Sequence, residues 1–406
     1  MYEQYDKAVQ IVLNYLNDQG FSRTPLKYFR QASRNFREYL EKHQLEYSGD
    51  SAQIWLEVLK QTTFKWKFLT SRRAMALIDD VVQNNTVTRL VFSYNKNTLK
   101  HRVPEGYKPL LNEYIKERME EGKQPSTLQM DVAACTRFLL FLQAQGINNV
   151  KFITPELIKD YHTQAEHRTV GGRNAYTYRI RNFIRFLARK KLVPETFEFA
   201  FSTEKAPKVS IVTTLSKKQV DRIKNYYRLG STPYELRSAA ISILTLRMGF
   251  RSTDICNLRI SDISWKNRTI SIVQQKTGVP LTLPFPVDVG NILFRYITEG
   301  RPICTIPKVF TSLNHPYRGI DKSQCYRSSV AILGTKRFPE DSRGMHILRR
   351  TFASKLLAAG NTVSIISAAL GHINEKTVDT YLSTDEQRMR LCSIGLTGIE
   401  IQEARI

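Results

Sequence analysis

The 406 residues suffice for two or three domains with their own cores, and a hydrophobic fraction of 42% is ordinary for a globular protein. The charge is unusual, because 61 Lys and Arg outnumber 37 Asp and Glu, and the net charge of +24 is spread along the chain. This pattern favours nucleic acid as the partner. It argues against a membrane or secreted protein, since we find no basic amphipathic anchor, apolar span or signal segment.

Cysteine usage excludes two further classes of protein. The five cysteines have no CxxC spacing and leave an odd count, which argues against a zinc site and a disulfide framework. This usage is typical of a reducing compartment, and we expect a cytoplasmic location. We also find no P-loop and no carboxylate cluster, so we expect neither a metal ion nor a cofactor.

The first hundred residues have the apolar periodicity of four helices. Aromatic and basic residues alternate between the third and fourth of them, with Phe64, Trp66 and Phe68 among four Lys and Arg. Aromatic rings among basic side chains can stack on nucleic acid. Such residues are more often half-buried core with a solvated basic rim, and we prefer that interpretation. A strand-like run at 90–94 and a polar connector at 95–104 follow.

A second helical unit is predicted from about 107 to 201, with a helix start at Thr154-Pro155-Glu156. From His167 to Pro194 there are eight Lys or Arg and no acid. An arginine row along one helix is suited to contact phosphates, whereas a merely solvated face usually mixes both signs. The predicted DNA contacts are Arg173, Arg179, Arg181, Arg185, Arg189, Lys190 and Lys191.

The next unit follows a basic linker at 204–213 and begins near Ser216, a predicted helix cap. A densely apolar helix ends at Gly249, and Arg251 and Asp254 come directly after it. Taken alone, Arg-x-x-Asp is more often a surface ion pair. Residues 268–273 alternate as a strand, and 281–285 form the returning strand of a hairpin, with Lys276 in its turn.

The segment 345–381 places several chemically active side chains in one helical unit. His346 and Arg349 are three apart and share a helix face, and Gly360 is a natural terminator for that helix. The next helix ends at Leu370-Gly371-His372, and Tyr381 follows nine residues later. The chain thus offers two imidazoles, a guanidinium and a phenol within a short stretch.

The order HxxR, Leu-Gly-His and Tyr resembles the tyrosine recombinases, or integrases, over about residues 105–390. The resemblance implies a mainly α fold with a small antiparallel β-sheet (α+β), closing as a clamp around DNA. Arg251 matches the family's first catalytic arginine, Asp254 its supporting acid and Lys276 its hairpin lysine. Arg350 stands where many members carry a second histidine, and we expect it to be supportive. The expected parts are an N-terminal helical domain (1–100, role unknown, DNA binding an open alternative), a core-type DNA-binding domain (105–203), a linker (204–213), a catalytic domain (214–385) and a tail (386–406).

The residue types are those that phosphodiester transfer needs. Arg251 and Arg349 can grip the nonbridging oxygens with fork geometry, and His346 and His372 can add hydrogen bonds. The resemblance implies that Tyr381 attacks phosphorus to give a 3′-phosphotyrosine, while Lys276 protonates the leaving 5′-oxygen. A 5′-hydroxyl of another strand can then reverse the step and form a Holliday junction.

Several functions remain open at this point. The first is a site-specific recombinase of a mobile element, acting as a homotetramer on double-stranded DNA with specific sites, and monomeric when free in solution. The others are an Xer-like resolvase of chromosome or plasmid dimers, a type IB topoisomerase, and an inactive DNA-binding regulator. The apolar tail at 386–406 can pack on its own domain or on a neighbouring protomer, and we favour the neighbour.

Overall fold

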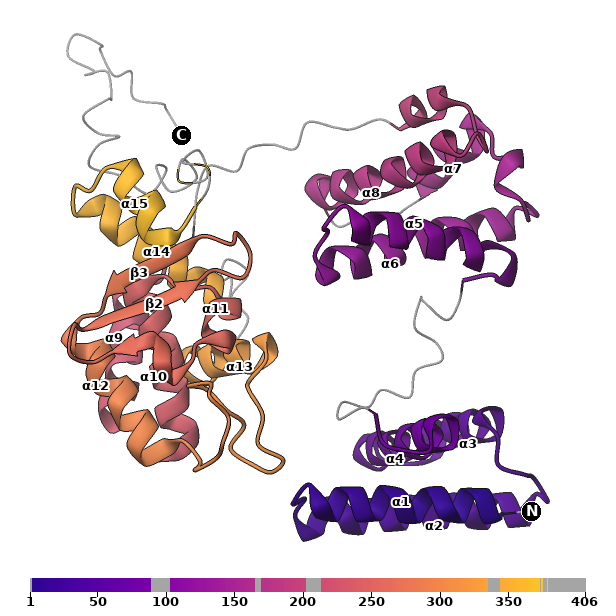
Figure 1. The fold of residues 1–406 in the computed structure, drawn as a ribbon, viewed down its shortest axis with the longest axis horizontal. Helices are drawn as coiled ribbons and strands as arrows, with labels where there is room; N and C mark the ends of the chain where they lie inside the picture. The colour runs from indigo at the N-terminus through magenta and orange to yellow at the C-terminus, as the bar shows by residue number, and fades with distance from the viewer. Residues whose placement is uncertain are drawn as a thin grey trace, which may run out of the picture. The chain divides into compact units, whose positions relative to one another are not determined.

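The computed structural model describes residues 2–88, 103–164, 169–201, 213–334 and 344–372, together with Asn374 and Val378 (Figure 1). The described chain is mainly helical with one small antiparallel sheet, which confirms the predicted fold class. It groups into two compact units, drawn from 1–12 with 28–208 and from 13–27 with 209–406. The strand-like run at 90–94 and the tail at 386–406 lie outside the described residues. Within them, no helix is long and apolar enough to cross a membrane.

Four helices form the N-terminal part, and the first three meet in an aromatic cluster. The Phe36 ring lies 5.8 Å from that of Tyr5 and 5.0 Å from that of Trp55, and the Tyr5 hydroxyl donates to the Ser33 carbonyl at 2.8 Å. Periodic apolar residues therefore build this core, as the sequence predicts. The helices are α1 (Glu3–Asp18), α2 (Arg23–Lys42), α3 (Gly49–Thr62) and α4 (Lys65–Asn84).

The aromatic residues at the start of α4 correct one prediction. Phe64 and Trp66 are 79% and 54% exposed, so the preferred interpretation as half-buried core is wrong for both. The Trp66 ring instead lies against the partly exposed ring of Tyr28, with centroids 5.4 Å apart. These two aromatic side chains form a surface pair.

A second group of helices encloses its own apolar core. Ile180, Phe183, Ile184 and Leu187 are fully buried along one helix of this group. The predicted start at Thr154 is confirmed, because its hydroxyl accepts from the Leu157 amide at 3.3 Å. The elements are η2 (Glu105–Tyr107), α5 (Lys108–Glu120), α6 (Pro125–Ala144), η3 (Val150–Phe152), α7 (Pro155–Gln164), α8 (Val170–Arg189) and η4 (Glu195–Ala200).

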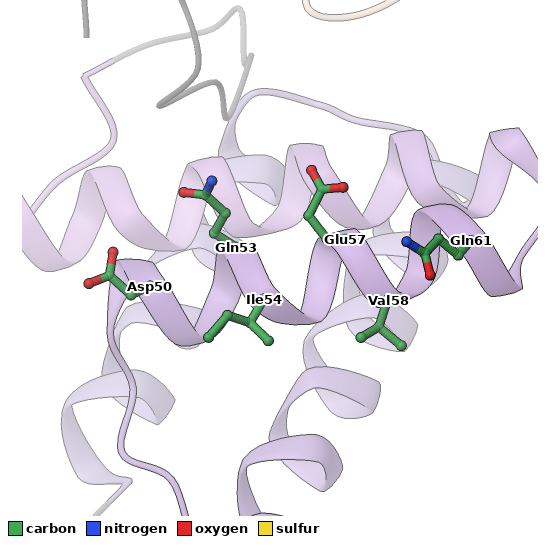
Figure 2. Close-up of a pocket in the computed structure, with 6 residues that line it drawn as sticks. All are labelled: Asp50, Gln53, Ile54, Glu57, Val58 and Gln61. Atoms are coloured by element: carbon green, nitrogen blue, oxygen red, sulfur yellow. The ribbon is translucent and has the colours of Figure 1, made fainter. Parts of the chain in front are cut away.

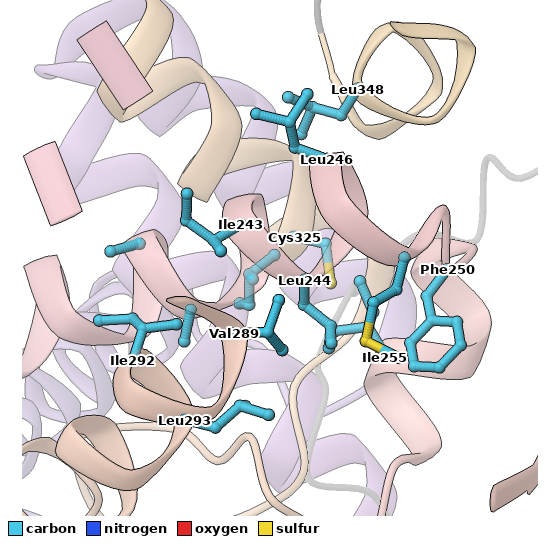
Figure 3. Close-up of a cluster of buried hydrophobic side chains, with 14 of the residues drawn as sticks. Ile243, Leu244, Leu246, Phe250, Ile255, Val289, Ile292, Leu293, Cys325 and Leu348 are labelled. Carbon is cyan, nitrogen blue, oxygen red and sulfur yellow. The ribbon is translucent and has the colours of Figure 1, made fainter. Parts of the chain in front are cut away.

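The C-terminal unit is built around α10 (Pro233–Met248), which is buried along most of its length. Figure 3 shows Ile243, Leu244 and Leu246 packed against apolar side chains from neighbouring helices. A left-handed glycine, Gly249 (φ +67°), ends α10. A side chain at Gly249 would lie 2.5 Å from the Phe352 ring, so only glycine allows the next residues to leave the core here.

The other elements surround α10 and carry the predicted hairpin. The sheet order is β1-β2-β3, all antiparallel, with Ile270 opposite Leu283. Strand β1 was not predicted, because two residues are too short to display alternation. The elements are α9 (Lys217–Leu229), α11 (Ser252–Asn257), η5 (Ile260–Asp262), β1 (Ile263–Ser264), β2 (Thr269–Val273), β3 (Pro280–Pro284), α12 (Val287–Arg295), η6 (Tyr296–Gly300), α13 (Lys322–Leu333), α14 (Met345–Ala358) and α15 (Val363–Leu370).

Candidate active site

Asp254 connects the start of α11 to the β2–β3 hairpin. Its side chain is 3% exposed and accepts from the backbone amides of Arg251 at 3.4 Å and Gln275 at 3.2 Å. Burial raises the pKa of this carboxyl, while the Gln275 amide and the charge of Arg251 act in the opposite direction. Asp254 therefore fixes the hairpin next to Lys276 relative to Arg251.

Gln274 was not predicted, and it lies fully buried between the hairpin and α15. Its Oε1 accepts from Nη1 of Arg251 and, at 2.9 Å, from the Thr277 hydroxyl. Its Nε2 donates to the Leu370 carbonyl at 3.0 Å. Alternation along β2 places residue 274 on the inward face of the sheet, together with Ile270. A polar residue at an inward position is unusual, and this was the feature of the sequence that could have identified Gln274.

Arg349 is 5% exposed and connects α14 to the ends of α10 and α15. Nη1 donates to the Gly249 carbonyl at 2.5 Å, and Nη2 donates to the Leu370 carbonyl at 2.8 Å. A carbonyl in the last turn of a helix has no partner within that helix and carries the negative end of its dipole. The Leu370 carbonyl is therefore a suitable acceptor for both Arg349 and Gln274.

His372 follows the left-handed residue Gly371 (φ +62°) and faces Arg349. Its Nε2 lies 3.0 Å from Nη2 of Arg349. Desolvation, and then the charges of Arg349, Arg251 and Lys276, lower the pKa of His372 to about 4. Nδ1 of this ring is buried and has no hydrogen-bond partner among the described residues.

His346 lies on the first turn of α14 and is exposed. Its pKa is lowered by desolvation first, and then by the charges of Arg350, Arg349, Lys276 and Arg251. Since Arg251, Arg349 and Lys276 act on both histidines, the structure brings these predicted residues into one region of positive potential. Arg350 adjoins this region through its effect on His346.

The structure describes the position of Lys276 but not that of Tyr381. Lys276 is exposed in the β2–β3 turn, where the Gln274 amide donates to the Val279 carbonyl at 2.9 Å and closes the loop. Tyr381 lies outside the described residues. Val378, three positions earlier, is fully buried in a cluster with Leu357, Ile366 and Leu370 of α14 and α15.

The assembled side chains form a site for an anion. The two guanidinium groups can donate in parallel to a phosphate, the nearby imidazoles and lysine add donors, and the Asp254 carboxylate is engaged by backbone amides. Among the residues that the structure describes, no group of His, Cys, Asp or Glu could hold a metal ion. The arrangement can therefore stabilise negative charge on a phosphodiester.

The predicted DNA contacts on α8 are largely paired within the fold. Arg181 donates to the carbonyls of Glu198 at 3.2 Å and Phe201 at 2.9 Å, and is only partly exposed. The acidic partners of the other basic residues could not be identified from the acid-free stretch itself, because they come from η4, α5 and α6. The ion pairs are Arg179 with Asp131, Arg185 with Glu198, Arg189 with Glu117, and Lys190 with Glu113. Arg173 is partly exposed near the start of α8, and Lys191 is exposed beyond its end.

A basic row on α2 has a different character. Arg23, Lys27, Arg30 and Arg34 follow the spacing i, i+4, i+7 and i+11, which places them on one face of the helix, and all four are exposed. Among the described residues, none of the four has an acidic partner within 4.0 Å. Their helical spacing was the signal that could have identified them from the sequence.

The hollow in Figure 2 contains none of the predicted site residues. It runs along α3, and its lining consists of Asp50, Gln53, Ile54, Glu57, Val58 and Gln61. All six come from a single helix, and the carboxylates among them would repel an anionic ligand. This surface is therefore unsuited to a phosphate.

Comparisons with known proteins agree with this description. Residues 213–388 match the model of the phage integrase family. The chain is 34% identical over 171 residues to the putative integrase/recombinase y4gC of Sinorhizobium fredii, covering 42% of this chain and 88% of that protein. It is 24% identical over 317 residues to tyrosine recombinase XerC of Bacillus pumilus, covering 73% and 95%. The fold is similar to that of the Tn1549 transposon integrase in complex with transposon right end DNA, with a TM-score of 0.52, 13% identity, and coverage of 70% and 99%.

Proposed function

The chain belongs to the phage integrase family of tyrosine recombinases, whose members cleave and rejoin DNA, and on this premise we propose that it is a site-specific recombinase acting through a 3′-phosphotyrosine. The observation that carries the proposal is the support of the two arginines. Arg251 is held by Gln274, and Arg349 by the carbonyls of Gly249 and Leu370, all of which are groups of the protein itself. Donors fixed in advance stabilise developing charge without the cost of reorganisation.

The proposed roles follow from charge and geometry. Arg251 and Arg349 bind the nonbridging oxygens of the scissile phosphate, where negative charge grows in the pentacoordinate transition state. His372 is neutral near pH 7 because its pKa is lowered to about 4, and through Nε2 it holds the Arg349 guanidinium in place. His346 adds a second imidazole on the same side of α14 as Arg349.

The covalent step requires a nucleophile and an acid. The Tyr381 oxygen forms the bond to phosphorus, the phenolic proton is lost, and the bond from phosphorus to the 5′-oxygen breaks. Lys276 supplies the proton that the 5′-oxygen takes up. Two observations support these assignments: the charge of Lys276 acts on both histidines, and the chain is anchored at Val378, three residues before Tyr381.

Double-stranded DNA with specific recombination sites is the proposed substrate, and a homotetramer on DNA the proposed assembly. The basic residues of α2 and α8, together with the net charge of +24, support DNA binding by the helical parts as well. The predicted domain boundaries, the clamp around the duplex, and packing of the tail at 386–406 on a neighbouring protomer belong to this proposal.

We propose a mobile element as the biological context. The helices α1 to α4 lie outside the stretch that matches the family model, and the transposon integrase is among the proteins with this fold. A role as an Xer-like dimer resolvase is the second candidate, favoured by the match that covers 95% of the XerC protein. Recombination assays on plasmids with paired chromosomal or element-end sites separate the two.

Nicked suicide duplexes test the central proposal. Loss of the short 5′-hydroxyl strand traps the covalent ester, so a recombinase accumulates a protein–DNA adduct joined at a 3′-phosphate. Specific binding without any adduct would indicate an inactive regulator. Relaxation of supercoiled plasmids that lack target sites would indicate a type IB topoisomerase.

A further inference from the structure

The side-chain amide of Gln274 has a single possible orientation. Oε1 faces two donors, Nη1 of Arg251 and the Thr277 hydroxyl, whereas Nε2 faces an acceptor, the Leu370 carbonyl. Rotating the amide by 180° would place donor against donor and oxygen against oxygen. Because the side chain is fully buried, such unsatisfied groups would be costly, so the network holds the amide in place.

Gly371 provides the space that this amide needs. A Cβ at Gly371 would lie 2.4 Å from Nε2 of Gln274, closer than any real contact. The backbone at Gly371 is also left-handed, with φ of +62°. Gly371 therefore has two roles: its left-handed backbone ends α15, and its missing side chain leaves room for the Gln274 amide.

Gln274 also closes the turn that carries Lys276. The backbone N–H of Gln274 donates to the Val279 carbonyl at 2.9 Å, and the backbone carbonyl of Gln274 accepts from the Gly278 N–H at 2.8 Å. One residue is thus hydrogen-bonded to Arg251, to the hairpin turn, and to the carbonyl that Arg349 also uses.

We propose that Gln274 is a positioning residue that holds the Arg251 guanidinium in its phosphate-binding orientation. This inference rests on the proposed recombinase function. An arginine side chain has several rotatable bonds, and fixing Nη1 leaves the remaining N–H groups aimed at the phosphate before DNA arrives. Gln274 acts through Arg251 and does not itself touch the DNA.

A double-mutant cycle tests this role. Single-turnover cleavage of a suicide duplex is measured for the wild type, Gln274→Leu, Arg251→Ala and the double variant. We expect Gln274→Leu to slow cleavage by about 10²-fold, the order found for one lost transition-state donor. In the Arg251→Ala background the same change should cost less than about threefold, because there is no guanidinium left to position.

Gln10→Leu is the matched control, since it makes the same chemical change at an exposed side chain on α1. It should leave cleavage within about threefold of wild type by the same additivity argument. An equal loss from Gln274→Leu in both arginine backgrounds would mean that the residue only stabilises the fold, and would overturn the inference.

A second readout needs neither DNA nor activity. In arginine-labelled protein, the guanidinium N–H signals of Arg251, assigned with Arg251→Lys, should show slow rotation in wild type and lose it in Gln274→Leu. Unchanged signals would overturn the inference. If the wild type forms no covalent adduct, the recombinase proposal fails, while this measurement still decides whether Gln274 holds Arg251.

Discussion

Nη2 of Arg349 lies 3.0 Å from Nε2 of His372, and this contact settles which nitrogen of the imidazole carries the proton. A guanidinium can only donate, so Nε2 must accept and the ring must be neutral with its proton on Nδ1. The lowered pKa of His372 has the same origin, since desolvation and the neighbouring cations disfavour a charged ring.

This pairing predicts how stability depends on pH. The pKa of His372 is about 4 in the folded protein and 6.5 in an unperturbed histidine, so the unfolded chain binds more protons between these values. The free energy of unfolding should therefore rise with pH across this window and fall on acidification through it. Urea titrations of wild type and His372→Gln from about pH 4 to about pH 7, a range that spans the folded and the unperturbed pKa, measure the difference. Parallel curves for the two proteins would contradict the neutral, buried state of the ring.

The nucleophile assignment predicts a clean separation of binding from chemistry. Tyr381→Phe removes only the phenolic oxygen, so it should abolish covalent capture of a nicked suicide site while the affinity for the same duplex stays unchanged. Gel shift and denaturing electrophoresis on one sample give both quantities. An adduct formed by the variant would assign the attack to another residue.

The two arginines should differ in what their loss does to the fold. Arg251→Ala and Arg349→Ala should each slow cleavage by about 3 kcal/mol of transition-state free energy or more. Arg349→Ala should also destabilise the protein by about 1–3 kcal/mol, because the buried carbonyls of Gly249 and Leu370 lose a donor. Cleavage within about tenfold of wild type, roughly 1.4 kcal/mol, would remove either residue from the phosphate site.

Lys276 can be tested through its leaving group. Lys276→Ala should block cleavage of ordinary DNA and have a much smaller effect on a duplex with a 5′-bridging phosphorothiolate. A thiolate leaves without a proton, so the missing acid matters little there. The matched comparison is Arg251→Ala, which should slow both substrates because the nonbridging oxygens are the same. Equal losses for Lys276→Ala on both substrates would exclude the role of general acid.

The basic rows of α2 and α8 should contribute differently to DNA affinity. Replacing Arg23, Lys27, Arg30 and Arg34 by Gln should lower the salt dependence of binding by about 0.9 per lost phosphate contact, and so by up to about 3.6. Replacing Arg181, Arg185 and Arg189 should lower it less, because these side chains already have partners in the fold. Filter binding to target and random duplexes at several salt concentrations measures both slopes. A larger decrease in salt dependence from the α8 substitutions than from the α2 substitutions would mean that α8 makes the main phosphate contacts.

Local patterns predicted much of this molecule because their causes are local. The end of α10 at Gly249, the caps at Thr154 and Ser216, and the β2–β3 hairpin all follow from neighbouring residues. What escaped prediction depends on residues far apart in the chain. The acids that pair with α8 come from other elements, and Gln274 becomes meaningful only when α15 is packed against the hairpin. Apolar periodicity predicts which face of a helix or strand is buried, but it does not predict which other element packs against that face.

The carbonyl at Leu370 makes the site depend on a single helical turn. Both Gln274 and Arg349 end on this one oxygen, at the C-terminus of the eight-residue helix α15. Helix ends open at a lower free energy than the core of a domain. Unwinding the last turn of α15 would release both supports in one event while α10 and its core stayed folded. The phosphate pocket would thus be lost as a unit, with no need to unfold the rest of the catalytic domain.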